Sequence, residues 1–368
     1  MKKILMIGYC NKFFRKEYAK NIEDTGCCFD ILSFEKAEKD SEIYYNKIFS
    51  CDNPFKGMWH VIGTYIKFFL IILTLPQYDA IHIHAVKKIE SIFAKMLRKK
   101  CRKLVCTIYG SDFYRISNQE RKKLCNLFDH TDYITIETEK TIEDFNVFFN
   151  YRYDKKIINI RFGISSIKKI IELQKNKIDI DSIKKIFGIP ADGFVITVGY
   201  NATKEQNHIE ILEQIKNIEM KLPSNYYIVI PLGYGDKIYG RNVAKKLEQL
   251  RLRGCCLFDF YDNENIAKLR IISSIMIQLQ DTDSLSSSMI EYLYAGNIII
   301  TGSWLPYREI QDYIITIEKI DNLSQCLADV LKKYEIKKNS LDKTDYRNFV
   351  ENNFIWENVK YEWKNLYA

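Results

Sequence analysis

The chain has 368 residues, which is long for one domain and predicts two. A hydrophobic share of 47%, with only 15 Gly and 6 Pro, indicates packed globular domains and excludes a low-complexity chain. The formal charge of +8 is confined to the first half, because residues 1–165 carry 28 Lys and Arg against 20 Asp and Glu, whereas residues 166–368 carry 27 of each.

The ten cysteines show no spacing typical of a disulfide framework or a zinc site. Cys27-Cys28 and Cys255-Cys256 are adjacent pairs, which do not suit a simple bridge. The apolar run at Ile4–Ile7 is too short for the apolar core of a secretory signal. We therefore expect a protein of the reducing cytoplasm.

In the first half, apolar strand-like runs alternate with helical stretches, at residues 2–8, 30–33, 78–84, 103–108, 132–136 and 156–160. This alternation predicts an open parallel α/β sheet. Ligands of such sheets gather at the carboxyl ends of the strands, where His84 and the loop Tyr109–Asp112 are expected.

Residues 58–76 form an apolar stretch whose uninterrupted part, at 68–73, is too short for a membrane span. We expect a helix packed in the core, with contact to a membrane interface as the alternative. The basic run Lys95–Lys103 suits an anionic membrane or a pyrophosphate-linked lipid, or is a solvated helix end. No motif for nucleic-acid binding accompanies it, so no nucleic-acid partner is expected.

The second half repeats the pattern, with strand-like runs at 194–199, 226–231, 257–260, 275–278 and 298–301. Residues 354–363 have apolar residues at helical spacing. Between the last two strands, the polar cluster Asp281–Ser288 opens a helix that carries Glu291 and ends at Gly296. Free N–H groups at this helix start attract a phosphate, and Glu291 can bind a hydroxyl. An ordinary βαβ crossover with a serine-rich cap is the alternative.

This segment resembles the donor-site motif of GT-B glycosyltransferases, particularly family 4. Asp283 and Glu291 correspond to the acid pair of the motif, with seven residues between them, and Ala295–Ile300 follows as its strand entry. Asp283 replaces the usual Glu. The resemblance implies two Rossmann-like doubly wound domains facing across a cleft: an acceptor domain at 1–165, a nucleotide-sugar domain at 166–345, and a C-terminal helix at 346–368 that crosses back to the first domain.

The turn after the first strand of the second half, Gly199-Tyr200-Asn201 with Lys204 beyond, matches the family's diphosphate-binding turn. Tyr200 stands where family 4 carries Arg. The turn is also similar to that of the transferase that adds an acetamido-dideoxyhexose in enterobacterial common antigen synthesis. That family inverts the anomeric configuration and family 4 retains it, so both outcomes stay open, with retention favoured by the context of Glu291.

The resemblance implies a role for each residue of the motif. Lys204 and the N–H groups of Ser286, Ser287 and Ser288 would stabilise the charge on the departing β-phosphate. Glu291 would bind the ribose hydroxyls, and Asp283 would face the transferred sugar.

An inverting reaction needs a base near the acceptor, and Asp112 is the candidate. The alternative for Asp112 is a residue that caps a turn. His84 is a candidate contact for a substrate hydroxyl, with a purely structural histidine as the alternative. Asp281 and Asp283 also fit the metal-binding DxD of GT-A enzymes, whereas the GT-B reading requires no metal and no cofactor.

We therefore expect a cytoplasmic glycosyltransferase, peripheral on the inner membrane face, that uses a UDP- or dTDP-linked sugar. The expected acceptor is a glycan on a polyprenyl pyrophosphate, in capsule, lipopolysaccharide or other cell-surface polysaccharide synthesis. A non-catalytic GT-B partner subunit is the alternative, motivated by the replaced Arg, His and Glu at Tyr200, Tyr109 and Asp283. A sugar-nucleotide epimerase has no base–acid pair to support it.

Overall fold

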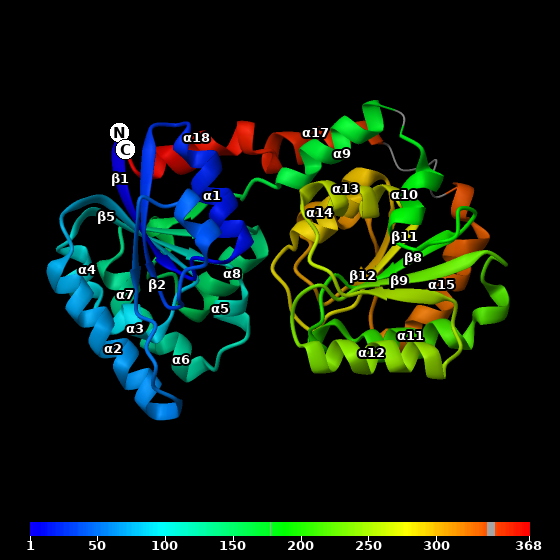
Figure 1. Cartoon of the computed structure of the whole chain (residues 1–368), viewed down its shortest axis with the longest axis horizontal. Helices are drawn as coiled ribbons and strands as arrows, with labels where there is room; N and C mark the ends of the chain where they lie inside the picture. The colour runs from blue at the N-terminus through cyan, green and yellow to red at the C-terminus, as the bar shows by residue number, and fades with distance from the viewer. Residues whose placement is uncertain (177, 337–342) are drawn as a thin grey trace. The chain divides into compact units, whose positions relative to one another are not determined.

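The computed structural model describes residues 1–176, 178–336 and 343–368. The chain forms two compact units, Met1–Gly163 with Trp356–Ala368 and Ile164–Ile355. Each unit is a twisted parallel sheet with helices on both faces (Figure 1). The predicted pair of doubly wound α/β domains is therefore confirmed. The chain leaves the first unit after Gly163 and returns to it at Trp356.

The first unit contains a seven-stranded sheet in the order β3-β2-β1-β4-β5-β6-β7, and every neighbouring pair is parallel. Its strands are β1 (Lys2–Gly8), β2 (Cys27–Ser33), β3 (Lys47–Ser50), β4 (Tyr78–His84), β5 (Cys101–Ile108), β6 (Tyr133–Ile136) and β7 (Ile157–Asn159). The central strands are apolar on both faces because helices cover both sides of the sheet.

Two hydrophobic cores lie on the two faces of this sheet. Leu5, Ile81 and Leu104 join the core with α2 (Gly57–Thr74), α3 (Lys88–Ile92), α4 (Ala94–Arg98), α5 (Ser111–Tyr114), α7 (Cys125–His130) and α8 (Glu139–Phe148). The short helix α6 (Asn118–Lys123) links α5 to α7. Ile4 and Val105 face the other core, with α1 (Phe13–Glu23) and α18 (Trp356–Leu366). The chain's two ends therefore share one core.

The second unit contains a six-stranded sheet in the order β10-β9-β8-β11-β12-β13, again parallel throughout. Its strands are β8 (Phe194–Val198), β9 (Tyr226–Pro231), β10 (Gly254–Leu257), β11 (Ile275–Gln278), β12 (Ile298–Gly302) and β13 (Ile315–Ile317). One face carries α11 (His208–Asn217), α12 (Lys237–Gln249) and α15 (Leu323–Lys332). The other carries α9 (Ser165–Lys175), α10 (Ile180–Ile186), α13 (Asn263–Ile272), α14 (Ser287–Ala295) and α17 (Lys343–Phe354).

Short 3-10 turns connect several of these elements: η1 (Lys39–Ile43), η2 (Asp154–Lys156), η3 (Lys204–Gln206), η4 (Glu219–Lys221), η5 (Arg308–Tyr313) and η6 (Ile320–Asn322). In both sheets the strand order reverses beside the first strand, between β1 and β4 and between β8 and β11. The crevice at the carboxyl ends of such a strand pair is the usual ligand site of a doubly wound sheet.

Two sequence predictions need correction. The strand expected at 257–260 lies at Gly254–Leu257, because its parallel pairing with β9 runs from Gly254 opposite Ile228 to Leu257 opposite Pro231. The apolar stretch at 58–76 is not a core helix. Only Phe68 and Ile72 of the 18 residues of α2 are buried, since only one narrow side of the helix packs into the core of the first unit.

Candidate functional site

The carboxyl ends of β8 and β11 bring together the predicted donor-site residues of the second unit. The turn after β8 holds Gly199, Tyr200 and Asn201, and β11 leads to Asp283 and the start of α14. Gly199 has φ +64°, and a Cβ there would lie 2.4 Å from Nε2 of His208. Only glycine fits this turn, which lets the chain pass close to the buried histidine.

A second loop, at residues 234–236, holds the turn after β8 in place. The N–H of Ala202 donates to the carbonyl of Tyr234 (2.7 Å), and the N–H of Asp236 donates to the carbonyl of Ala202 (2.7 Å). Gly235 has φ +112°, and a Cβ there would lie 2.6 Å from the same carbonyl oxygen. Asn201 accepts from the N–H of Thr203 (3.0 Å), an Asx-type turn that shapes the backbone before Lys204.

Lys204 lies at the start of η3 and is exposed. Within the described part of the chain its ammonium has no ion-pair partner, which leaves it available to an anion. Burial lowers the pKa of the neighbouring His208 to about 3, so His208 is neutral at physiological pH. Lys204 is therefore the cation that this turn offers.

Glutamine side chains connect the turn to β11. The Tyr200 hydroxyl donates to Oε1 of Gln280 (3.3 Å), and Nε2 of Gln206 donates to the same oxygen (2.8 Å). Gln206 and Gln280 are buried. Tyr200 thus holds the turn against the end of β11.

Asp283 is held by three groups. Its Oδ2 accepts from the N–H of Ser286 (3.2 Å), from the Tyr307 hydroxyl, and at 3.4 Å from Nε2 of Gln278. Burial next to this carboxylate keeps the pKa of Tyr307 well above its usual range, so the hydroxyl is a donor. Neither Tyr307 nor Gln278 belongs to the sequence-predicted site.

The start of α14 carries the three predicted serines. Ser286 is the N-cap residue, and its side chain makes no capping hydrogen bond. The N–H of Ser286 is already bound by Asp283, which corrects the prediction that all three serine N–H groups await a phosphate. The hydroxyl of Ser288 is buried and has no partner in the described ranges.

Glu291 lies one turn further along α14, with only 6% of its surface exposed. Its Oε2 accepts from Nε of Arg270 (2.9 Å) and its Oε1 from the Ser166 hydroxyl (2.6 Å). Arg270 is equally buried and also donates to the Tyr292 hydroxyl (2.7 Å). The carboxylate is therefore pre-oriented by α9 and α13, and each oxygen keeps lone-pair capacity for a ligand hydroxyl. Its role toward ribose stays a prediction.

The two candidates of the first unit lie at the carboxyl ends of β4 and β5. Asp112 accepts from the N–H of Tyr109 (2.9 Å) and of Val86 (3.0 Å), so it fixes two loops, the turn role that the sequence left open. Burial raises the pKa of Asp112 to about 6. A carboxyl with this pKa can still exchange a proton near neutral pH, and its role as a base stays a prediction.

His84 is buried and lies against the ring of His82, with 3.9 Å between the ring centroids. Its Nδ1 hydrogen-bonds the Tyr109 hydroxyl (2.7 Å), and its Nε2 has no partner in the described segments. Burial, with His82 and Arg15 nearby, holds the pKa of His84 well below its usual range. His84 is therefore a neutral imidazole, and its predicted contact with a substrate hydroxyl is untested.

No metal centre accompanies these residues. Across residues 1–176, 178–336 and 343–368 there is no group of three His, Cys, Asp or Glu side chains that could hold a metal. Asp281 accepts from Nδ2 of Asn207 (2.8 Å), which ties it to the start of α11.

Comparison with known proteins agrees with this arrangement. The sequence profile described as glycosyl transferase 4-like matches residues 3–138. A protein of Methanocaldococcus jannaschii, the uncharacterized glycosyltransferase MJ1069, is 25% identical over 303 residues, which cover 75% of this chain and 70% of that protein. The profile lies in the first unit, whereas the sequence motif lies in the second.

Solved structures match nearly the whole chain. Anabaena Alr3699/HepE in complex with UDP and glucose gives a TM-score of 0.75 at 13% identity, covering 99% of both chains. Sucrose-phosphate synthase of Thermosynechococcus elongatus gives 0.76 at 14% identity, covering 100% of this chain and 98% of that one. A glycosyltransferase of Rickettsia africae gives 0.75 at 15% identity, covering 100% and 97%.

The fold is that of the GT-B glycosyltransferases. The prediction of an enzyme of the glycosyltransferase class is confirmed by the family profile, the curated relative and the fold together. The fold does not support the interpretation of Asp281 and Asp283 as the metal-binding DxD of a GT-A enzyme, because both aspartates lie in a GT-B fold.

Proposed function

We propose that this GT-B glycosyltransferase binds a UDP- or dTDP-linked sugar in its second unit and transfers the sugar to a glycan acceptor on a polyprenyl pyrophosphate, with retention of configuration. The juxtaposition of Asp283, the start of α14 and the Gly199–Lys204 turn at the β8–β11 switch point carries this proposal. The complex of Anabaena HepE with UDP and glucose supports the same class of donor.

The chemistry assigned to the site is stabilisation of the leaving group. Cleavage of the sugar–phosphate bond places negative charge on the β-phosphate. Lys204 and the unused N–H groups at the start of α14 would stabilise that charge, and one lost donor of this kind costs about a hundredfold in rate. The departing phosphate takes the acceptor's proton in a retaining reaction, so no protein base is required. If the reaction inverts, Asp112 is our candidate base.

The acceptor and the location belong to the same proposal. The basic first half favours a polyprenyl-pyrophosphate acceptor and a role in cell-surface polysaccharide synthesis, with the protein at the cytoplasmic membrane face. The similarity of the Gly199–Asn201 turn to the common-antigen transferase supports an acceptor of this type.

The first experiment is calorimetric titration of the wild-type chain with UDP, dTDP and GDP in the presence of EDTA. We expect one nucleotide to bind, and Lys204→Met to weaken it about tenfold or more, because a charge-assisted contact is lost. Lys185→Met, an exposed lysine on α10, is the matched control and should bind as wild type. Lys204 has no ion pair in the described part of the chain, so its loss leaves the fold intact.

Glu291→Gln is a second test of the same site. We expect weaker nucleotide binding, and its unfolding curve must be recorded in parallel, because an unpaired buried Arg270 destabilises the unit. Binding that appears only on addition of Mg²⁺ or Mn²⁺ would restore the metal-binding alternative for Asp281 and Asp283.

A non-catalytic partner subunit is the second candidate. The observation that favours it is the Tyr200 hydroxyl, which is engaged with Gln280 where the family places a free Arg. Failure of folded wild-type protein to bind any of the three nucleotides would support this candidate and overturn the proposed donor site.

A further inference from the structure

The helix α2 exposes an unusually large apolar surface. Its exposed large apolar side chains, together with Phe55 just before it, are Met58, Trp59, Val61, Ile62, Ile66, Phe69, Leu70 and Leu73. Isolated exposed apolar residues are common on soluble proteins, but a contiguous group of this size marks an interaction surface. Trp59 is 67% exposed and Met58 73%.

The exposed residues follow the helical repeat. Met58, Ile62, Ile66, Leu70 and Leu73 are three or four positions apart, so they lie along one side of the helix. The inner side is anchored by Phe68, whose ring lies 5.7 Å from Phe34 and 5.6 Å from Phe93 between centroids. The helix is therefore apolar on both sides, and its outward side is exposed.

Positive charge surrounds this apolar side. The helix contains no Asp or Glu, and Lys56 is exposed just before it. Lys67, in the middle of the helix, is also exposed, and its ammonium donates to the carbonyl of Asp52. Phe93, which immediately precedes α4, lies 5.9 Å from Phe69 of α2. The exposed lysines Lys95 and Lys99 of α4 and its C-terminal end therefore belong to the same region, as the neighbouring α2 and α4 in Figure 1 show.

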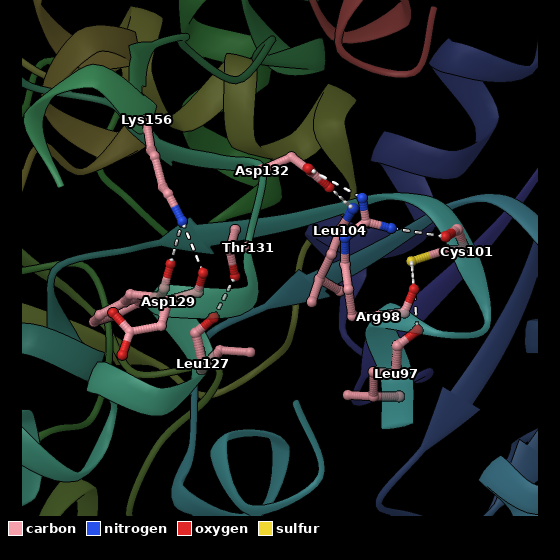
Figure 2. A network of polar contacts seen from close by, with 10 residues as sticks. Leu97, Arg98, Cys101, Leu104, Leu127, Asp129, Thr131, Asp132 and Lys156 are labelled. Carbon is pink, nitrogen blue, oxygen red and sulfur yellow. Dashed lines mark hydrogen bonds and ion pairs between the residues drawn. The ribbon is translucent and has the colours of Figure 1, made fainter. Parts of the chain in front are cut away.

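Arg98 and Lys100 of the basic run are occupied within the fold. Figure 2 shows Arg98 donating to the Cys101 carbonyl (3.0 Å) and paired with Asp132 (3.3 Å). Lys100 donates to the carbonyls of Leu73 (2.9 Å) and Leu75 (2.8 Å), so it caps the C-terminal end of α2. Lys95 and Lys99 have no ion pair in the described ranges and are available to external anions.

By length and composition alone α2 could cross a membrane. The topology favours a position along the surface instead. The strands before and after the helix, β3 and β4, belong to one parallel sheet, and Phe68 and Ile72 pack into its core. A spanning orientation would detach this helix from the sheet, whereas an in-plane orientation keeps both contacts.

We propose that α2 lies in the interfacial plane of an anionic lipid bilayer, with its outward apolar side among the acyl chains and Lys56, Lys95 and Lys99 at the lipid phosphates. A large apolar side flanked by lysines is the combination that binds anionic membranes peripherally. This inference does not depend on the nucleotide-sugar site, which lies in the other unit.

The test is co-sedimentation of the full chain with vesicles of phosphatidylcholine alone and with phosphatidylglycerol added. We expect binding to the anionic vesicles, a blue shift of Trp59 fluorescence that Trp59→Phe abolishes, and at least about tenfold weaker binding of Ile62→Ser/Ile66→Ser/Leu70→Ser, because apolar burial is lost. Lys95→Gln/Lys99→Gln should weaken binding to anionic vesicles and leave binding to phosphatidylcholine unchanged.

The matched control is Ile186→Ser/Met220→Ser/Ile238→Ser, three exposed apolar residues of the second unit, which should sediment as wild type. Equal sedimentation of wild type and the α2 triple variant would overturn the proposal. So would a concentration-dependent dimer that the triple variant abolishes while vesicle binding is absent, since a second copy would then cover the helix. Nucleotide titration of the triple variant keeps this test separate from the donor site.

Discussion

At the scale of single residues, the donor site depends on partners that are distant in sequence. The acid pair Asp283 and Glu291 follows from their spacing in one short segment. Arg270, Ser166 and Tyr307, which hold these two carboxylates, could not be found that way. Their contacts arise only when α13, α9 and the segment after β12 pack beside α14, and no local pattern encodes that packing.

The buried carboxyl of Glu90 allows a test of the first unit. Glu90 is fully buried on α3, and neither carboxylate oxygen has a hydrogen-bond partner in the described part of the chain. Burial raises the pKa of Glu90 from 4.5 to about 8. Between these values the unfolded chain loses the proton and the folded chain keeps it, so the free energy of unfolding falls as pH rises, by up to about 1.4 kcal/mol per pH unit.

Glu90→Gln should remove this loss, so that the variant exceeds wild type in stability near pH 8 and the difference shrinks toward pH 4.5. Urea unfolding across that window, followed by a probe in the first unit, measures the effect. Glu264→Gln, at an exposed i,i+4 pair with Lys268, is the control and should leave the pH dependence unchanged. Parallel curves for Glu90→Gln and wild type would show that the carboxyl is ionised in the fold.

At the scale of helices and strands, the sequence predicts most accurately the strands that helices cover on both faces of the sheet. The runs at 78–84, 226–231 and 275–278 coincide with β4, β9 and β11, because a strand buried on both faces is apolar at successive positions. The short edge strands β3 and β13 were not predicted, since their side chains are partly exposed and their sequences lack that signature. For α2, an apolar composition cannot tell which side the protein covers.

The C-terminal end of α14 gives a test at this scale. Gly296 ends the helix with φ +93°, and no atom lies within 4 Å of a Cβ placed there. Gly296→Ala should therefore destabilise the second unit by about 1 kcal/mol through backbone strain alone, and Gly296→Asn by less. Gly240→Ala, at a helical glycine in α12 without positive φ, should be neutral or stabilising. The midpoints of urea unfolding of the three variants, compared with wild type, measure these changes in stability. An unchanged midpoint for Gly296→Ala would contradict the predicted backbone strain.

At the scale of the whole molecule, the sequence separates two α/β units, and the resemblance implies a C-terminal helix that returns to the first, but the contacts that hold this helix come only from the structure. Trp356, Val359 and Trp363 of α18 pack with Tyr18 and the sheet in one core. The Tyr367 hydroxyl binds Nδ1 of His82 (2.6 Å) and the Tyr18 hydroxyl, so a buried polar chain fixes the last residues to β4 and α1.

A chain ending at Ile355 should therefore lose the cooperative folding of its first unit and keep that of its second. Hydrogen exchange read by mass spectrometry should show β1 and β4 unprotected and β8 and β11 protected, because only the first sheet loses a covering helix. Tyr361→Ala, at an exposed position of α18, is the control, and the amides of both sheets should remain protected from exchange in this variant. Full protection of β4 in the shortened chain would mean that α18 is dispensable.

The shared core of the two chain ends also sets an order of events during synthesis. Residues 1–163 leave the ribosome first, yet the covering helix of their sheet is made last. At 5–20 residues per second, the roughly 190 residues between them take about 10–40 s to translate. During that interval the core side of Tyr18 and of β1 lacks its covering helix, while the second unit is still being synthesised. The unit translated first is thus the unit that finishes folding last.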